Sequence, residues 1–421
     1  MTSSILPPEL MFIFHVLISI FLIFKNNLKF DKALFNLLIP IFCIAICGFA
    51  YASQNMTMNV LKDGWYLIKI IPCIIIGWIS AKNMTKRDIF LSIIFAGTCL
   101  SFYHVVAFAL YSAQGYGSDI IRIMVGSSPL SVLLLGILFS NRYFRRELEI
   151  FGFSSVFILV VNLWSIYLSD SRSSYLVMLI FVLVMNGFYK INFKGIMGLV
   201  IVIGFLSIVT TFLSIEEDPS GGRESLDSRF ARGLLEITPS EGEDRKSRSL
   251  SFRGYESFLA MKEFSDGSLG EMILGQGFGA TVDLGETWIL GGVPGEEAGE
   301  VEFDELLIIH NGYLLVLVKY GMIGVLLYMY FIFSWIKLSH HRRTLVYGDE
   351  MFHRLIVATA LASFMYSLVV TGLFNKTSFG ALLIIVGALL CTCHKRNASL
   401  VSKEERLSEL VSRQVKNQQG A

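Results

Sequence analysis

Long apolar runs alternate with shorter polar connections along most of this chain. A lipid hydrocarbon core about 30 Å thick is crossed by a helix of about 20 mostly apolar residues. Runs of roughly that length occupy residues 9–24, 33–52, 64–81, 88–111, 125–140, 150–168, 173–189, 195–214, 311–338, 354–371 and 378–394. The pattern predicts an all-α polytopic membrane protein with about eleven transmembrane helices.

One connection is far longer than the others and divides the chain. We expect transmembrane helices one to eight in residues 1–214, a large external loop in 215–309, helices nine to eleven in 310–394, and a cytoplasmic tail in 395–421. Within the loop, aromatic residues at helical spacing between Phe252 and Phe264 predict a helix. The glycine-rich run from Leu274 to Gly279 predicts a tight turn that packs the loop onto the membrane domain.

Basic residues fix the expected orientation of these spans. They gather in alternate connections, at Lys25, Lys29, Lys32, Lys82, Lys86, Arg87, Arg142, Arg145, Arg146, Lys190, Lys194, Arg342, Arg343, Lys395 and Arg396. The connections between them, such as Ser53 to Asp63 and Gly372 to Thr377, carry little excess positive charge. Because cytoplasmic loops are enriched in lysine and arginine, the N-terminus and the long loop are expected outside and the C-terminus in the cytoplasm.

Composition agrees with a membrane protein and removes some other classes. Hydrophobic residues make up 54% of the chain and charged residues 16%, and the mean hydropathy is +0.61. A soluble protein of this balance could not cover its surface with polar groups. The net charge of +1 gives no reason to expect a nucleic-acid partner. All six cysteines lie in apolar runs, which excludes a disulfide-stapled external domain.

His310 is the first candidate for chemistry. It stands where the long loop meets the ninth predicted span and is followed by Asn311 and Gly312. A histidine with an unperturbed pKa near 6.5 suits proton transfer at neutral pH, so His310 is a candidate general base. A capping or interfacial histidine is the alternative.

Two arginines on the expected outer side are candidates for binding an anion. Arg172 lies among hydroxyl residues in the tight turn between two spans, where its guanidinium can form paired hydrogen bonds to a lipid diphosphate. The alternative is a solvated residue paired with Asp170. Arg253 falls on the predicted loop helix, where Phe252 and Tyr255 would anchor it on the membrane beside the headgroups. A plain surface arginine is the alternative there.

Two lysines fall inside or close to predicted spans. Lys69 lies toward the outer end of the third span, and Lys319 lies about two turns after His310. Ionisable residues within a membrane are costly and are functional candidates by default. Both lysines could instead extend their ammonium groups to the membrane surface.

Three ordered motifs resemble a known family. They are Ser171-Arg172-Ser173-Ser174 between two spans; Ser251-Phe252-Arg253-Gly254-Tyr255 followed by Leu274-Gly275-Gln276-Gly277-Phe278-Gly279; and His310-Asn311-Gly312-Tyr313-Leu314 followed by Tyr320-Gly321-Met322-Ile323-Gly324. Between about Leu168 and Trp335 the chain resembles the bacterial O-antigen ligase and O-antigen polymerase superfamily. One departure is Lys319, which stands where relatives often carry an acid.

The resemblance implies an all-helical glycosyltransferase of the GT-C type in the bacterial inner membrane. Such enzymes transfer glycan from an undecaprenyl-diphosphate-linked donor at the periplasmic face, without nucleotide sugar, cofactor or metal ion. Carried over to this sequence, Arg172 and Arg253 would bind the diphosphate and His310 would orient or deprotonate the acceptor hydroxyl. We further expect substrate contacts from Lys69, Arg122, Tyr255, Asn311, Tyr313 and Lys319.

Several functions stay open on the sequence alone. The first is a polymerase that joins lipid-linked repeat units into a surface polysaccharide, and the second is a ligase that moves finished glycan to lipid A-core. Chain-length regulator and flippase proteins are further expected partners. A transporter would require ionisable residues in mid-membrane and repeated, broken helices. A structural scaffold would leave His310, Arg172 and Arg253 replaceable.

Overall fold

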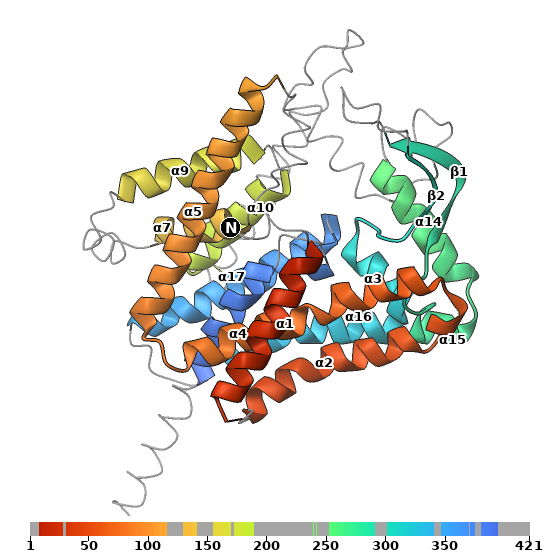
Figure 1. Ribbon diagram of the computed structural model, residues 1–421, viewed down its shortest axis with the longest axis horizontal. Coiled ribbons are helices and arrows are strands. Elements are labelled where there is room, and N and C mark those ends of the chain that lie inside the picture. Colours follow the sequence, from red (N-terminus) through yellow and green to blue (C-terminus); the bar gives the residue numbers. More distant parts are fainter. Residues whose placement is uncertain are drawn as a thin grey trace, which may run out of the picture.

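The computed structural model describes residues 8–27, 31–115, 129–140, 155–169, 172–188, 239, 241, 252–290, 301–340, 347–369, 371–374 and 380–394. Its elements are α1 (Pro8–Lys25), α2 (Lys32–Phe49), η2 (Ala52–Gln54), α3 (Thr57–Ile68), α4 (Ile70–Ala81), α5 (Lys86–Ala113), α7 (Pro129–Ser140), α9 (Ser155–Ser169), α10 (Arg172–Met185), α14 (Phe252–Asp266), α15 (Leu269–Leu274), β1 (Val282–Leu290), β2 (Val301–Leu306), α16 (Gly312–Ser339), α17 (Tyr347–Val369) and η3 (Gly372–Phe374). A further apolar helix occupies Gly380–His394. Figure 1 shows α5, α7, α9 and α10 gathered on one side of the molecule, and α14, β1 and β2 on the other.

Five of the described helical stretches are long and apolar enough to cross a membrane. They are Lys32–Phe49, Thr57–Ala81, Lys86–Ala113, Gly312–Ser339 and Met351–Leu368. Shorter apolar helices lie at Leu10–Lys25, Val156–Ser169, Ser174–Met185 and Gly380–His394. The predicted helical, multi-pass membrane protein is therefore confirmed. The predicted eighth span (195–214) and the tail after residue 394 lie outside the described residues.

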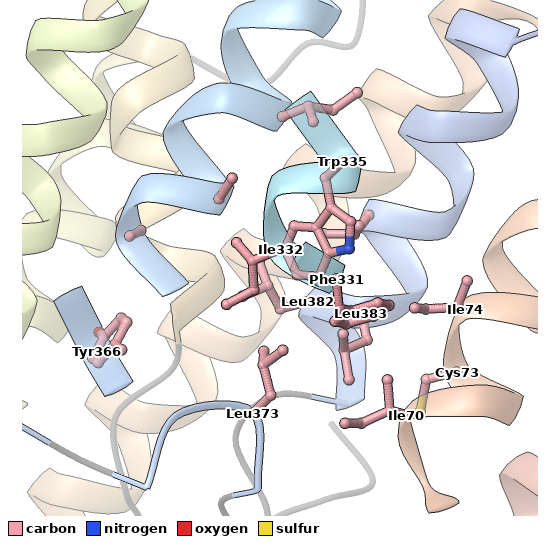
Figure 2. Close-up of a cluster of buried hydrophobic side chains, with 14 of the residues drawn as sticks. Ile70, Cys73, Ile74, Phe331, Ile332, Trp335, Tyr366, Leu373, Leu382 and Leu383 are labelled. Atoms are coloured by element: carbon pink, nitrogen blue, oxygen red, sulfur yellow. The ribbon is translucent and has the colours of Figure 1, made fainter. Parts of the chain in front are cut away.

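The core that joins these helices lies around the C-terminal half of α16. Trp335 of α16 is fully buried and packs in one cluster with Ile74 of α4 and Leu383 of the last helix (Figure 2). A Cβ atom added to Gly77 would lie 1.8 Å from the carbonyl oxygen of Ile384, so only glycine allows α4 and the last helix to approach this closely. Small residues at such crossings let membrane helices pack backbone to backbone.

Contacts between the connections can be compared with the charge pattern at each end of the helix bundle. At one end of the bundle, the Asp31 carboxylate lies 3.1 Å from the Lys82 ammonium and accepts a hydrogen bond from the Trp78 indole at 2.7 Å. At the other end, which we call the loop side, the Asn55 amide donates to the carbonyl of Gln276 at 2.9 Å. Segments expected on the same side of a membrane therefore contact one another.

Two parts of the predicted fold need correction. The chain is not purely helical, because β1 and β2 form a two-stranded antiparallel sheet within the loop. Alternating charged and apolar residues around Glu302 are typical of a strand. The acidic, glycine-rich residues beside them are typical of a linker, and for that reason the strand is not predicted. The third predicted span, 64–81, also begins too late, since α3 starts at Thr57 within the connection Ser53 to Asp63.

α16 is interrupted at Gly321, where the backbone adopts φ 65° and ψ −169°. In a continuous helix the carbonyls of Val318 and Lys319 would accept hydrogen bonds from the N–H groups four residues later. The break removes these two donors. The loop supplies replacements: the N–H of Gln276 donates to the Val318 carbonyl at 2.8 Å, and that of Gly277 to the Lys319 carbonyl at 3.0 Å. The prediction that the glycine-rich run packs onto the membrane domain is thus confirmed, and its backbone completes a broken membrane helix.

Replacing Gly321 by alanine is expected to destabilise the protein by about 3 kcal/mol or more, because this backbone region is essentially restricted to glycine. A Cβ atom there would also lie 2.3 Å from the Ile273 carbonyl oxygen, so α15 would have to move. Thermal unfolding of the detergent-solubilised protein measures the loss. Gly64→Ala is the matched control, since nothing lies within 4 Å of its added Cβ and alanine favours a helix interior. Equal effects of the two substitutions would contradict this account of the break.

Candidate functional site

His310 lies immediately before α16, as the sequence predicts. Asn311 caps this helix: its side-chain oxygen accepts hydrogen bonds from the N–H groups of Tyr313 at 3.0 Å and Leu314 at 3.2 Å. Asparagine is among the preferred N-cap residues because it satisfies donors that the first turn leaves unpaired. The cap fixes where α16 begins, and so fixes the backbone that carries His310.

A buried carboxylate holds the His310 side chain. Oε2 of Glu256, in α14, lies 2.8 Å from His310 Nδ1, and Oε1 accepts the backbone N–H of His310, also at 2.8 Å. The Glu256 side chain is 1% exposed, whereas that of His310 is 46% exposed. Nδ1 is therefore the ring nitrogen that pairs with the carboxylate, and Nε2 is the ring nitrogen that Glu256 does not engage. The arrangement suits His310 to accept a proton from a group arriving from the exposed side.

Glu256 is the functional residue that the sequence analysis missed. A signal for it exists, because it falls on the same face of the predicted helix as Phe252 and Leu259. An acidic residue on an otherwise apolar face is rarely buried without a partner. The partner lies 54 positions away along the chain, and no spacing rule connects the two.

Arg253 stands on the same helix as Glu256, three residues earlier and partly exposed. Residues three apart on a helix are neighbours on its surface. Arg253 is therefore within about one helical turn of the residue that orients His310. This placement puts one of the two predicted arginines on the helix whose carboxylate pairs with the candidate base.

Arg172 begins α10, and the structure describes its backbone but not its side chain. In the same first turn, Ser174 is buried and forms a hydrogen bond with Tyr366 of α17. Tyr313, in the first turn of α16, donates from its hydroxyl to the Phe364 carbonyl of α17 at 3.2 Å. The first turn of α10, which carries Arg172, and the first turn of α16, which follows His310, thus both pack against α17 near residues 364–366. Arg122 lies outside the described residues.

The expected role of Tyr255 as a membrane anchor is wrong. Its side chain is 5% exposed, and its hydroxyl donates to the Leu284 carbonyl of β1 at 2.9 Å. It fastens α14 to the sheet because a buried tyrosine needs a partner for its hydroxyl. Its side chain therefore offers almost no exposed surface for the expected substrate contact.

The two lysines are buried, and neither extends to the surface. Lys69 lies at the junction of α3 and α4, with its ammonium 5.5 Å from the centre of the Tyr66 ring. The Lys319 ammonium lies 2.5 Å from the carboxylate of Asp63, which also accepts the Gly279 N–H at 2.7 Å. Although Lys319 replaces an expected acid, a carboxylate from α3 lies directly beside it.

The described residues contain no cluster of three or more His, Cys, Asp or Glu side chains placed to hold a metal ion. No protein-family model matches this chain, and none of the curated proteins is significantly similar to it. The candidate site consists of a half-exposed histidine, its buried carboxylate partner and an arginine one turn away on the same helix as that carboxylate.

Proposed function

We propose that this chain is a glycosyltransferase of the bacterial inner membrane, with about eleven spans, a GT-C-like architecture and its loop side in the periplasm. It would transfer glycan from an undecaprenyl-diphosphate-linked donor to a sugar hydroxyl, as a polymerase of a surface polysaccharide. The observation that carries the proposal is the His310–Glu256 pair, where a half-exposed base is oriented by a buried acid at the junction of loop and membrane helix. The resemblance to O-antigen polymerases and ligases supplies the substrate class.

In the proposed reaction, Nε2 of His310 accepts the proton of the acceptor hydroxyl as its oxygen attacks the anomeric carbon of the donor. The bond between that carbon and the diphosphate oxygen breaks, and the lipid diphosphate leaves with the electron pair. Arg172 and Arg253 would stabilise the charge that develops on the leaving diphosphate. Direct attack inverts the anomeric centre and needs no covalent enzyme intermediate.

A transporter is the alternative that the structure makes worth weighing. α16 is broken at Gly321, and the pair of Lys319 and Asp63 is buried beside the break. Both are features that transporters use for substrate and ion sites. Here, however, the carbonyls freed by the break are bonded to the loop backbone, and the two charges are bonded to each other. Groups that are already bonded within the chain stabilise the fold and are not available to bind a transported substrate or ion. The enzyme is therefore the better-supported proposal.

Replacing His310 by alanine is expected to lower glycan transfer by about 10²- to 10⁴-fold, which is the usual contribution of general base catalysis. The test expresses the variant as the sole copy in cells and analyses their surface glycan by gel electrophoresis. Loss of long chains, with single repeat units still on lipid A-core, would mark a polymerase. Loss of all glycan from core, with lipid-linked polymer accumulating, would mark a ligase.

The control is His340→Ala, which removes an exposed histidine at the opposite end of α16. It should leave the glycan unchanged. Arg172→Ala and Arg253→Ala should reproduce the His310→Ala pattern, because in the proposed reaction they stabilise the leaving diphosphate in the same transfer step that His310 assists as base. Normal glycan in all three site variants would rule out both enzyme functions.

A further inference from the structure

Two membrane helices carry exposed apolar stripes that lead toward the loop side. On α2 the stripe consists of Phe42, Ile46 and Phe49, which are spaced by four and three residues. On α16 it runs from Phe333 through Leu326 to Met322. Residues at this spacing share one face of a helix. In a membrane protein such stripes face lipid.

The lengths of these two helices set a common level for the edge of the hydrocarbon. α2 has 18 residues and ends at Phe49, which corresponds to about 27 Å of helix. The part of α16 after the break, from Met322 to Ser339, has the same number of residues and the same length. Each is close to the roughly 30 Å of a bilayer core. Phe49 and Gly321 therefore mark the loop-side boundary of the hydrocarbon.

The short helix α15 lies at this boundary and contacts residues next to the loop-side end of each stripe. A Cβ atom on Gly270 would lie 2.5 Å from the hydroxyl oxygen of Tyr51, just beyond α2. The backbone of Ile273 lies against Gly321, where its carbonyl oxygen is 2.3 Å from the position of an added Cβ. α15 thus spans the gap between the ends of the two lipid-facing stripes.

α15 presents exposed apolar side chains of its own at this level. Leu269 is 74% exposed, the highest value among the large hydrophobic side chains that the structure describes, and Ile273, one turn later on the same face, is 41% exposed. The helix is firmly formed, because Ser268 and Glu271 make a reciprocal capping box at its start. Three further apolar residues follow η2 along the chain and are exposed as well: Met56, which precedes α3, and Met58 and Leu61 within it.

We propose that α15 is seated in the interfacial layer of the lipid bilayer, with Leu269 and Ile273 inserted among the acyl chains. The partner is the bilayer itself, since apolar side chains that extend a lipid-facing surface lose contact with water by entering it. α15 then sets the depth of the neighbouring helix α14. The first part of α16 and His310 rise up to roughly 15 Å beyond the hydrocarbon edge, to the level of headgroups and glycan.

The test is a depth measurement by spin labelling of the full chain in phosphatidylcholine vesicles. Cysteine is introduced at Leu269, at Ile273 or at the control position Asp266, an exposed residue three positions before α15. The signal of the identically treated wild-type chain is subtracted. Labels at Leu269 and Ile273 are expected to be relaxed by oxygen, which concentrates in lipid, several-fold more than by a water-soluble nickel complex. The label at Asp266 should show the reverse preference.

Water-accessible labels at both Leu269 and Ile273 would overturn the proposal and would leave a protein partner or a second copy of the chain as the cover. Leu269→Trp gives a check without a label, because brominated phospholipids should quench its added emission strongly and should spare that of Asp266→Trp. Neither readout depends on enzyme activity. The membrane seating of α15 can therefore fail its test while the proposed function stands, and the proposed function can fail while the seating of α15 stands.

Discussion

Replacing Glu256 by glutamine is expected to lower glycan transfer by about 10²- to 10⁴-fold while leaving the protein folded. Glutamine has nearly the same shape, and its oxygen can still accept the backbone N–H of His310. Its amino group would then face Nδ1, which must become an acceptor. The ring proton moves to Nε2, and the nitrogen that should take the acceptor's proton is blocked.

The measurement is turnover by the purified protein with a lipid-linked donor, where kcat should fall and KM for the donor should change little. Because Glu256 is buried and bonded to His310, its role in the proposed reaction is to position that histidine. Asp266→Asn removes an exposed carboxylate from the same helix and serves as the control, with activity expected near that of wild type. A Glu256→Gln protein that turns over normally would remove the reason to regard His310 as an oriented base.

Replacing Lys319 by methionine is expected to destabilise the folded state by about 3–5 kcal/mol, the usual cost of leaving one partner of a buried ion pair alone. The carboxylate of Asp63 would keep only the Gly279 N–H as a described partner. Asp63→Asn should cost a comparable amount, because it leaves the ammonium of Lys319 buried without its counterion. The double variant should recover most of the loss, since neither charge remains.

Thermal unfolding in detergent measures all three variants, and Lys62→Met, an exposed lysine next to Asp63, is the control. The expected signature is a large coupling between Asp63 and Lys319, seen when the double variant is more stable than the sum of the single losses predicts. Additive losses would mean that the two side chains act independently. Such a result would contradict their pairing.

The sequence predicted the parts of the site that depend on local pattern. His310 was placed at the start of a membrane helix because hydropathy changes there, and α14 was expected because its aromatic residues repeat at helical spacing. Glu256 and Asp63 were not found. Each forms its pair with a residue distant along the chain, and such a pairing leaves no periodic trace.

The fold shows the same division. Hydropathy predicts where α2, α5 and α16 lie, because the bilayer demands a continuous run of apolar residues. It does not reveal the break at Gly321, since the residues on both sides remain apolar and only the backbone angles change. The β1–β2 hairpin was missed because its paired strands flank an acidic, glycine-rich run that resembles a plain linker.

The backbone bonds from Gln276 and Gly277 into α16 have a consequence for building hybrid proteins. A loop transplanted from another chain would bring donors shaped for a different helix, and the carbonyls of Val318 and Lys319 would be left without partners in an apolar setting. The transferable unit is therefore the stretch from α14 through Gly321, not the loop alone. The same bonds imply an order of assembly, because the first part of α16 can complete its backbone hydrogen bonds only after the loop that precedes it has folded against it.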